Sequence, residues 1–482
     1  MTRPLQDVSI SQLAGLTLDD LTAAYRSAAL DPVQVVEAML HQTERVNPVL
    51  NAIYGQRPDE ARIEAQAAQQ RWRSGQPLSR FDGVPVTIKD SVPAMGMRWH
   101  HGSALHGDGI LGTADGLPTR RLRAAGAIIL GKGTMPDFGL SASGVSGSHG
   151  IVRNPWGTAW NTGGSSAGGG ASLAAGIGMM SVGSDIAGSV RLPAAHCGLA
   201  ALKPTQGLIP HAPASTVRSA GPITRRASDL LAWTRLLSGP DPLDRYSLPL
   251  TGQTPAAAWL SGVTVGTCAD FGFGPDVEPA VRACFDQAAA VLARLVGKLR
   301  PVWATYGFDT YLPIDDSLKL RGWYEYAGAD AAHRARAPQE LVDWFAEAET
   351  WTPARIREFE TGIERGVAGT VALMEGVDFL LTPVMPLVNF PAEARGPVFG
   401  MPLRHTTFTA PFNQSGHPAV SLAGGFDARG LPIGIQLVGQ RHDDLRLLAL
   451  ATALEAELDV MGAAGKSWPV EPVISTQKEP SR

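Results

Sequence analysis

The segment over residues 163–191 constrains this chain more than any other. It opens with Gly163-Gly-Ser-Ser-Ala-Gly-Gly-Gly170, continues through a run of small apolar residues over 171–180, and closes with Ser181-Val-Gly-Ser-Asp-Ile-Ala-Gly-Ser-Val-Arg191. Glycine permits positive φ angles and close backbone approach, so clustered glycine and serine predict N–H groups and hydroxyls that converge on one point. A flexible linker would not continue into an apolar run and a second turn. We therefore expect two glycine-rich turns that flank one helix.

The composition of the whole chain limits the classes of protein that it can represent. With 482 residues, of which 44% are hydrophobic and 18% charged, the chain can bury a sizeable core. A net charge of −4 without any basic run argues against nucleic acid as a partner. We find neither a signal-peptide pattern nor an apolar run long enough for a bilayer. Cys197, Cys268 and Cys284 are odd in number, which predicts a reducing, cytoplasmic location.

Expected strands alternate with expected helices along the sequence, which indicates the α/β fold class. Hydrophobic patterns predict strands over 84–89, 127–130, 263–266, 378–383 and 433–438. They predict helices over 17–45 (two helices), 120–126, 230–237, 275–299, 306–375 and 443–458. Ser228 is placed to cap the helix over 230–237. Residues 154–162 are expected to form a loop.

That expected loop decides between two interpretations of the first glycine-rich turn. Residues 164–168 match the G-x-S-x-G pattern of a nucleophile elbow centred on Ser166. The elbow needs a buried strand immediately before it, and 154–162 does not have the pattern of one. We therefore favour a different arrangement of the serines.

A serine nucleophile needs a base, and few histidines accompany the glycine- and serine-rich segment. His149 and His196 are the candidates, and we interpret His196 as structural. A lysine can serve instead if burial keeps it neutral. Lys89 and Lys132 each follow an apolar strand pattern, so the pattern alone does not choose between them.

Three histidines in one segment, His100, His101 and His106, raise the question of a metal site. Neither cysteines nor carboxylates accompany them at a spacing typical of metal ligands. We therefore expect loop residues, no metal and no cofactor, and leave the roles of His100 and His101 open.

Several stretches together resemble the amidase signature family. The main ones are Gly163-Gly-Ser-Ser166, Gly183-Ser-Asp-Ile-Ala-Gly-Ser-Val-Arg-Leu-Pro-Ala-Ala-His-Cys-Gly198 and Leu202-Lys-Pro-Thr-Gln-Gly207. Other stretches that follow the family order are Val84-Pro-Val-Thr-Ile-Lys-Asp90, Arg153-Asn-Pro-Trp156, Leu381-Thr-Pro383, Phe408-Thr-Ala-Pro-Phe-Asn413 and Gly430-Leu-Pro-Ile-Gly-Ile-Gln-Leu-Val-Gly439. The resemblance covers nearly the whole chain and implies a large, twisted, mixed β-sheet core covered by α-helices. It also implies a single amidase domain over 1–482, with a signature-bearing core at about 60–245 and 376–460 and a variable, helical, substrate-side region at about 245–375.

Carried over to this sequence, the resemblance implies a Ser–cis-Ser–Lys triad. Ser189 would be the nucleophile, Ser165 the bridging serine on a cis peptide, and Lys89 the base; the two serines lie 24 positions apart, as in the family. A hydroxyl can both accept and donate a proton, which suits a relay. The implied oxyanion hole consists of the backbone N–H groups of Ile186, Ala187, Gly188 and Ser189. Ala187 stands where the family commonly has glycine, and Ala167 interrupts the family's Gly-Gly-Ser-Ser-Gly.

The resemblance implies an amidase that cleaves the C–N bond of a carboxylic amide through an acyl-enzyme on Ser189, giving a carboxylate and ammonia or an amine. We expect a small-molecule amide as partner, neither nucleic acid nor membrane, and leave a homodimer open. Two rivals remain: an amidotransferase component that supplies ammonia to a mischarged tRNA together with partner chains, and a catalytically silent binding protein.

The resemblance does not specify the substrate or any esterase side activity. Aromatic residues crowd the variable region, where they either line an apolar pocket or pack a helical layer. They are Trp323, Tyr324, Tyr326, Trp344, Phe345 and Trp351. Asp185 and Arg191, on either side of the expected nucleophile, are implied to hold their turn through hydrogen bonds.

Overall fold

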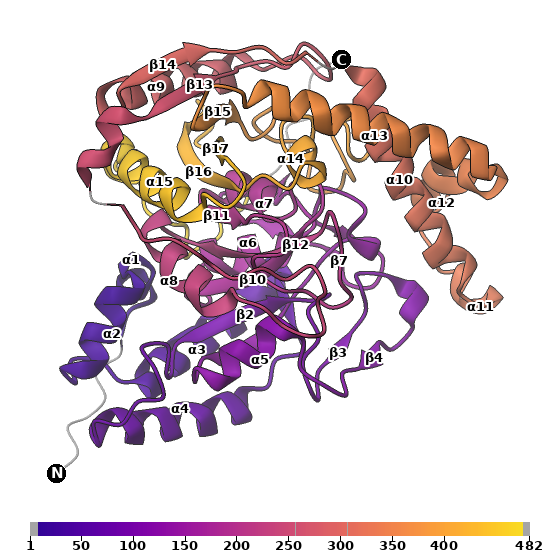
Figure 1. Cartoon of the computed structure of the whole chain (residues 1–482). Coiled ribbons are helices and arrows are strands. Elements are labelled where there is room, and N and C mark those ends of the chain that lie inside the picture. The colour runs from indigo at the N-terminus through magenta and orange to yellow at the C-terminus, as the bar shows by residue number, and fades with distance from the viewer. Residues whose placement is uncertain (1–7, 256, 306, 476–482) are drawn as a thin grey trace.

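A computed structural model describes residues 8–255, 257–305 and 307–475, and its centre is an 11-stranded sheet (Figure 1). In spatial order the strands are β1 (Ile53–Tyr54), β5 (Ile128–Gly133), β2 (Pro85–Lys89), β10 (Met180–Asp185), β12 (Ser219–Thr224), β11 (Ala200–Lys203), β16 (Ala419–Phe426), β17 (Pro432–Gly439), β15 (Phe379–Pro383), β13 (Thr264–Thr267) and β14 (Lys298–Pro301). Strands β5, β2 and β10 are parallel to one another, as are β15, β13 and β14. Strand β1 is antiparallel to β5, and all pairs from β10 through β15 are antiparallel. The sheet is therefore mixed, and the predicted fold class is confirmed.

The sheet separates two helical layers, and strand β11 shows how. Ala200 and Leu202 belong to an apolar cluster with side chains of α8, α9 and α15, whereas Ala201 belongs to a cluster with α6 and α7. Successive side chains of a strand point to opposite faces, so the two groups of helices cover opposite faces. The bounds are α6 (Ala167–Ala174), α7 (Arg191–Cys197), α8 (Ala227–Leu237), α9 (Pro279–Leu295) and α15 (Asp444–Leu458). The proposed reactive residues lie beside α6 and α7.

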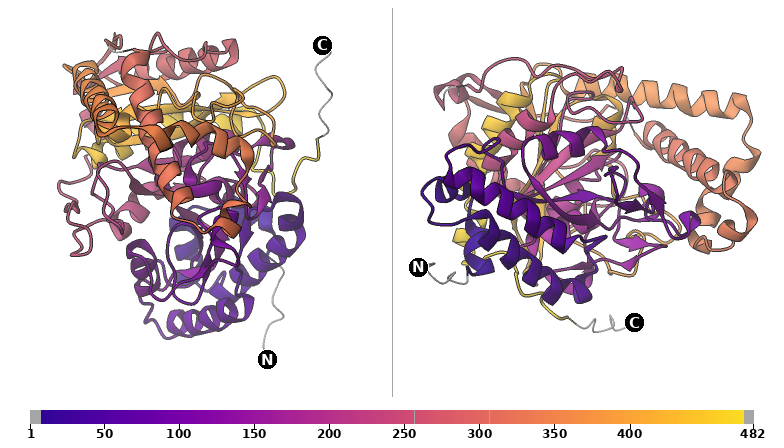
Figure 2. Two further views of the ribbon diagram at one scale, coloured as in Figure 1. Left: turned by 90° about the vertical axis from the view of Figure 1, so that its right-hand side faces the viewer. Right: turned by 90° about the horizontal axis from the view of Figure 1, so that it is seen from below.

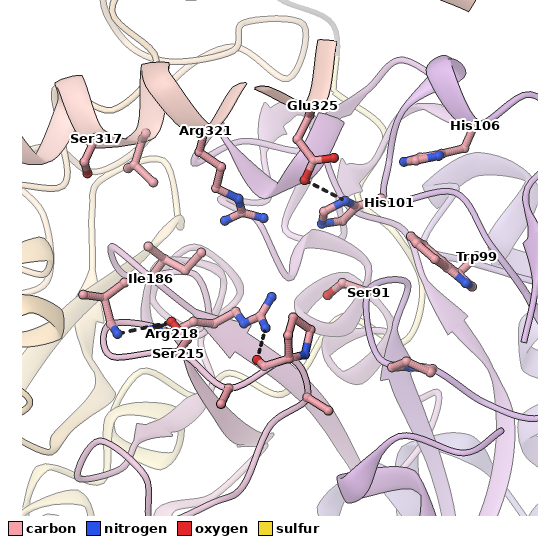
Figure 3. Close-up of a pocket in the computed structure, with 16 residues that line it drawn as sticks. Ser91, Trp99, His101, His106, Ile186, Ser215, Arg218, Ser317, Arg321 and Glu325 are labelled. Atoms are coloured by element: carbon pink, nitrogen blue, oxygen red, sulfur yellow. Dashed lines mark hydrogen bonds and ion pairs between the residues drawn. The ribbon is translucent and has the colours of Figure 1, made fainter. Parts of the chain in front are cut away.

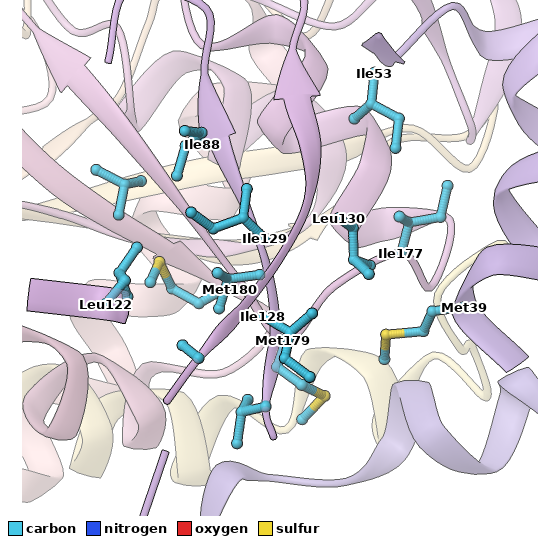
Figure 4. Close-up of a cluster of buried hydrophobic side chains, with 14 of the residues drawn as sticks. Met39, Ile53, Ile88, Leu122, Ile128, Ile129, Leu130, Ile177, Met179 and Met180 are labelled. Carbon is cyan, nitrogen blue, oxygen red and sulfur yellow. The ribbon is translucent and has the colours of Figure 1, made fainter. Parts of the chain in front are cut away.

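The N-terminal helices cover the end of the sheet that carries β5, β2 and β10 (Figure 4). Met39 and Leu122, from two of these helices, share one buried cluster with Ile88, Ile129 and Met180 of the three strands. The helices are α1 (Ile10–Gly15), α2 (Leu18–Arg26), α3 (Pro32–Leu50), α4 (Pro58–Arg73) and α5 (Leu117–Ala124). This packing fixes the apolar strand that ends at the expected base.

Four helices form an arm that extends to one side of the sheet (Figures 1 and 2). They are α10 (Phe308–Ala327), α11 (Ala331–Arg334), α12 (Gln339–Phe345) and α13 (Pro353–Leu373). Phe345 is buried where α10 and α12 meet, with its ring 5.6 Å from that of Tyr326. The prediction of a helical region over 306–375 is confirmed for the residues that the structure describes.

The remaining elements are short and surround the sheet. The hairpins pair β3 (Arg98–Trp99) with β4 (Ile110–Leu111), β6 (Val145–Ser146) with β7 (Gly150–Ile151), and β8 (Arg153–Asn154) with β9 (Gly157–Asn161). Two further helices are α14 (Ala410–Gln414) and α16 (Val460–Ala463). Across the described residues, we find no helix with the length and apolarity that crossing a membrane requires.

Four local predictions were wrong. The expected loop over 154–162 contains β9, and the helix expected over 275–299 ends at Leu295, before β14. The second glycine-rich turn is shorter than expected because residues 181–185 belong to β10. Ser228 does not cap α8, because the helix begins at Ala227, whose N–H donates to the Glu455 carboxylate of α15 at 2.8 and 2.9 Å. A side chain that is distant in sequence replaces the local cap.

Candidate active site

The two glycine-rich turns lie against each other. The first precedes α6 and contains a cis peptide between Gly164 and Ser165. The second joins β10 to α7, and the Ser189 carbonyl accepts a hydrogen bond from the Ser166 N–H at 3.0 Å. Gly188 has φ of +123°, and a Cβ there would lie 2.5 Å from the Thr409 hydroxyl oxygen. Glycine is therefore required at the position just before Ser189.

Lys89 ends β2 and reaches into the first turn. Its Nζ lies 2.8 Å from Ser165 Oγ, 3.1 Å from Ser184 Oγ and 3.2 Å from the Ser184 carbonyl oxygen. Lys89 and Ser165 are each 2% exposed. Ser189 is also buried, and its hydroxyl makes no hydrogen bond within the described chain. The structure thus joins the expected base to the expected bridging serine and leaves the Ser189 hydroxyl uncommitted.

Lys89 differs from the other buried lysines in its hydrogen-bond partners but not in the direction of its pKa shift. Burial lowers the pKa of Lys89 to about 7, of Lys203 to about 7 and of Lys132 to about 8. The amino groups of Lys132 and Lys203 donate to backbone carbonyls, at 2.9 Å in each case. Among these three lysines, only Lys89 contacts serine hydroxyls. The contacts thus distinguish Lys89 from Lys132, which the sequence pattern alone did not.

A buried ion pair fixes the second turn, as the resemblance implied. Asp185 accepts hydrogen bonds from the N–H groups of Gly188 at 2.7 Å and Val190 at 3.1 Å, and from the Arg191 guanidinium at 2.9 and 3.0 Å. The Asn413 amide donates to the same carboxylate at 2.9 Å. Burial would raise the pKa of Asp185, but the Arg191 charge and these hydrogen bonds outweigh it and hold the pKa well below its usual range.

The same contacts change the expected set of backbone donors. The Gly188 N–H is occupied by Asp185, so it differs from the other three amides of the expected oxyanion hole. In the part of the chain that is described, the N–H groups of Ile186, Ala187 and Ser189 donate to no acceptor. Ala187 has a negative φ, so its methyl group is accommodated without a left-handed conformation. Three N–H groups of this turn, including that of Ser189, are therefore without an acceptor among the described residues.

A cavity of about 620 Å³ opens beside this turn (Figure 3). It is lined by Ser91, Pro93, Trp99, His101, His106, Ile186, Ala212, Pro213, Ala214, Ser215, Val217, Arg218, Ser317, Leu318, Arg321 and Glu325. None of the six aromatic residues singled out in the variable region is among them. Trp344 and Phe345 are buried within the arm, and Tyr324 is exposed. These aromatic side chains therefore do not line this cavity, and two of them, Trp344 and Phe345, pack within the helical arm.

The structure separates the histidines that stand together in sequence. His100 packs beside Tyr54 and His149, outside the cavity lining, whereas His101 and His106 line the cavity. Ligand atoms of His101, His106 and Glu325 lie within 4.8 Å of one another. Glu325 comes from the arm, so no local spacing pattern could have connected it to the histidines.

The elbow and histidine alternatives both lose support in three dimensions. Strand β9 does precede the first turn, but it pairs with β8 outside the central sheet, and Ser166 has φ of −88° at the start of α6. His196 is buried, with its Nδ1 3.1 Å from the Asn161 carbonyl oxygen and its Nε2 2.8 Å from Met385 Sδ. Its structural interpretation is confirmed by these contacts.

Sequence reasoning missed three polar groups in this region. Ser184 contacts Lys89 from the neighbouring strand β10, and its position directly before Asp185 in the second glycine-rich segment was the available signal. Arg218 and Arg321 reach the cavity from a loop before β12 and from α10. Nothing in the local sequence of either arginine indicates that they face the same space.

Comparisons with known proteins identify the class to which this fold belongs. The family model described as Amidase matches residues 34–306 and 345–448. The chain is 31% identical over 490 residues to a glutamyl-tRNA(Gln) amidotransferase subunit from Geobacter metallireducens, covering 92% of this chain and 97% of that one. It is 30% identical over 471 residues to an acylamidase of Rhodococcus erythropolis, covering 92% and 95%.

A similar fold is known from a crystal structure of a bacterial aryl acylamidase of the amidase signature family. The two structures agree with a TM-score of 0.83 at 24% sequence identity, over 93% of this chain and 99% of that one. The chain is thus an enzyme of the class that hydrolyses amide bonds. It belongs to the amidase signature family.

Proposed function

We propose that this enzyme hydrolyses small carboxylic amides through an acyl-enzyme on Ser189, with Ser165 as relay and Lys89 as base. The observation that carries the proposal is the 2.8 Å contact between Lys89 Nζ and Ser165 Oγ, with Ser189 on the adjoining turn. A pKa of about 7 leaves much of Lys89 uncharged at neutral pH. A neutral amine accepts a proton that an ammonium cannot.

The proposed reaction moves one proton along the serines. Neutral Lys89 takes the Ser165 hydroxyl proton while Ser165 takes that of Ser189, whose oxygen attacks the amide carbon. The tetrahedral oxyanion accepts hydrogen bonds from the N–H groups of Ile186, Ala187 and Ser189. The proton then returns to the leaving nitrogen, the C–N bond breaks, and water attacks the ester by the same route. The products are a carboxylate and ammonia or an amine.

Chemical labelling tests the assignment of the nucleophile. A fluorophosphonate probe should modify the wild-type protein at Ser189, and mass spectrometry of the digest locates the adduct. Ser189→Ala should abolish labelling and lower amidase turnover by about 10⁴-fold or more while circular dichroism stays unchanged. Ser166→Ala is the matched control, because that buried serine belongs to the other turn. An adduct on Ser166 would instead support the elbow.

The amidotransferase relatives supply a second candidate function. The Geobacter metallireducens protein is, by its name, one component of an amidotransferase, and this chain spans 97% of it. The acylamidase relative matches the same share of this chain, 92%, so coverage does not distinguish the two candidates. Purification at native expression level distinguishes them: two further subunits that co-elute and support transamidation would establish the second candidate. The cytoplasmic location, the homodimer and the division into core and variable region remain predictions.

A further inference from the structure

Two arginines that line the cavity, Arg218 and Arg321, form no ion pair with any of the residues that the structure describes. Arg218 Nη2 donates to the Pro213 carbonyl oxygen at 2.7 Å, and its buried Nε makes no hydrogen bond. Arg321 Nη2 donates to the Phe138 carbonyl oxygen at 3.2 Å. Across the described residues, neither guanidinium forms an ion pair. Guanidinium groups that are partly withdrawn from water without a carboxylate are uncommon, because the loss of hydration is not compensated.

These two guanidinium groups face the same space from different elements. Figure 3 shows Arg321 extending from α10 toward the Arg218 side chain, which rises from the loop before β12. After burial, the charge of Arg321 is the largest influence that lowers the pKa of Arg218. Glu325 is the single carboxylate among the lining residues. It lies 3.9 Å from His101 Nδ1 and forms no ion pair with either arginine, but its negative charge raises the pKa of both and so offsets part of their positive charge. The cavity therefore carries an excess of positive charge.

The arginines share the cavity with one residue of the reactive turn, whereas Lys89, Ser165 and Ser189 are not among its lining residues. Ile186, whose N–H is one of the three unpaired donors, lines the same cavity. The charges of Arg218 and Arg321 both lower the pKa of Lys89, which places them within electrostatic range of the proposed base. A molecule whose amide carbonyl meets this turn would extend past one or both guanidinium groups.

We propose that Arg218 and Arg321 bind a carboxylate of the substrate, so that the preferred substrates are amides that carry a negative charge on their acyl or amine portion. Guanidinium groups bind carboxylates through paired, charge-assisted hydrogen bonds, and such an anion would compensate both charges at once. A bound cation would instead be repelled by the same pair. The inference rests on the proposed amidase function and specifies its substrate class.

Matched substrate pairs test the proposal. On the acyl side, succinamate is compared with 4-methylpentanamide, which has the same shape without the charge. On the amine side, N-acetylglycine is compared with N-isobutylacetamide. Released ammonia or amine gives kcat/KM for each compound. We expect the charged member of at least one pair to exceed its neutral partner by tenfold or more. Equal or lower values for the charged member in both pairs would overturn the proposal.

Substitutions locate the preference on the two arginines. Arg218→Met and Arg321→Met should each reduce the charged-to-neutral ratio of kcat/KM by tenfold or more, with most of the change in KM. If Arg218→Met folds poorly, Arg218→Lys is used in its place. It keeps the positive charge and should therefore keep part of the charged-to-neutral ratio of kcat/KM. Arg336→Met removes an exposed arginine near the arm's tip and should leave the ratio unchanged. A ratio that is unchanged in both methionine variants would contradict the assignment.

Binding without turnover separates this proposal from the proposed function. In calorimetric titrations of the Ser189→Ala protein, succinamate or N-acetylglycine should have a lower Kd than its neutral counterpart. If Ser189→Ala still hydrolyses amides, the proposed nucleophile is wrong, and the ratio measured with the arginine variants still tests the carboxylate site. If Ser189→Ala is inactive and no charge preference exists in turnover or binding, the amidase stands and the carboxylate site is wrong.

Discussion

The turn over residues 186–190 and the helical arm (α10–α13) both border the cavity, but they are stabilised in different ways. The turn is held by a fully buried ion pair, in which Asp185 and Arg191 are each 0% exposed. The arm has partly exposed ion pairs, such as Arg355 of α13 with Asp316 of α10 at 2.6 Å. Its contribution to the cavity consists of side chains on one face of α10, among them Arg321.

The difference indicates that the two regions serve different purposes. Backbone N–H groups can stabilise an oxyanion only if their positions do not change, and a buried hydrogen-bond network provides that rigidity. Side chains on a helix surface can be exchanged without altering the backbone. We therefore interpret the turn as the reactive region and the arm, with the loop over 212–218, as the region that selects the substrate.

The largest expected effect distinguishes two buried lysines of the central sheet. Lys89→Met should lower kcat by about 10³-fold or more, because it removes the proposed base. Activity of the wild-type protein should rise with pH through a single ionisation near 7, since the neutral amine is the active form. Lys132→Met should retain that ionisation, because Lys132 Nζ donates to the Val92 carbonyl oxygen rather than to a serine. Initial rates between pH 5 and 9 check both variants.

The opposite pattern would reassign the base. If Lys132→Met erased the acidic limb while Lys89→Met kept it, the 2.8 Å contact with Ser165 would be structural only. The proposed relay through Ser165 would then be wrong as well.

The next effect compares an ion pair of the turn with one of the arm. Asp185→Asn leaves Arg191 buried without its anion and should lower the free energy of unfolding by roughly 3–5 kcal/mol. Asp316→Asn, in the arm, should lower it by less than about 1 kcal/mol, because Arg355 is 43% exposed. Urea unfolding monitored by fluorescence provides both values. Similar losses for the two variants would show that the turn is not the more rigid region.

The contribution of Asp185 to the free energy of unfolding depends on pH with a defined sign. The folded state lowers the pKa of Asp185, so its stabilisation is fully present above the unfolded value of about 3.9. It is lost as the pH falls through the folded value. The difference in the free energy of unfolding between the wild type and Asp185→Asn should thus stay constant from pH 5 to 8 and become smaller below about pH 4.

The sequence could predict the two glycine-rich segments and the strand that ends at Lys89 because their constraints are local, but the choice of Lys89 over Lys132 came from the family resemblance. Gly188 precedes Ser189 directly, and the apolar strand that ends at Lys89 is continuous in sequence. The cavity walls could not be predicted, since Arg218 and Arg321 are about a hundred residues apart and meet only through the packing of α10. Strand β9 was missed because it lies in a small hairpin outside the sheet, and its mostly buried residues include polar side chains and do not alternate regularly between apolar and polar.

A smaller effect connects the two regions electrostatically. The positive charge of Arg321 lowers the pKa of Lys89, so Arg321→Met should raise that pKa and move the acidic limb to higher pH. Activity on a neutral amide at pH 6, relative to its own plateau, should fall by about twofold. Arg336→Met is the control for a general loss of charge and should not move the limb. A limb that does not move in Arg321→Met would mean that the arm does not act on the proposed base, and a limb that moves to lower pH would contradict the expected sign.

The smallest expected effect is that of a chelator. His101, His106 and Glu325 bring three potential ligand atoms within 4.8 Å, an arrangement that resembles part of a zinc site. Arg321 lies near enough to lower the pKa of His101 further, after burial, and the same charge disfavours a bound cation. The proposed serine mechanism also needs no metal.

Dialysis against EDTA should therefore leave kcat/KM unchanged, and elemental analysis of the purified protein should find less than about 0.1 zinc per chain. A stoichiometric metal whose removal lowers kcat/KM would show that the arm supplies a reactive group, and the separation between the reactive turn and the selecting arm would no longer hold.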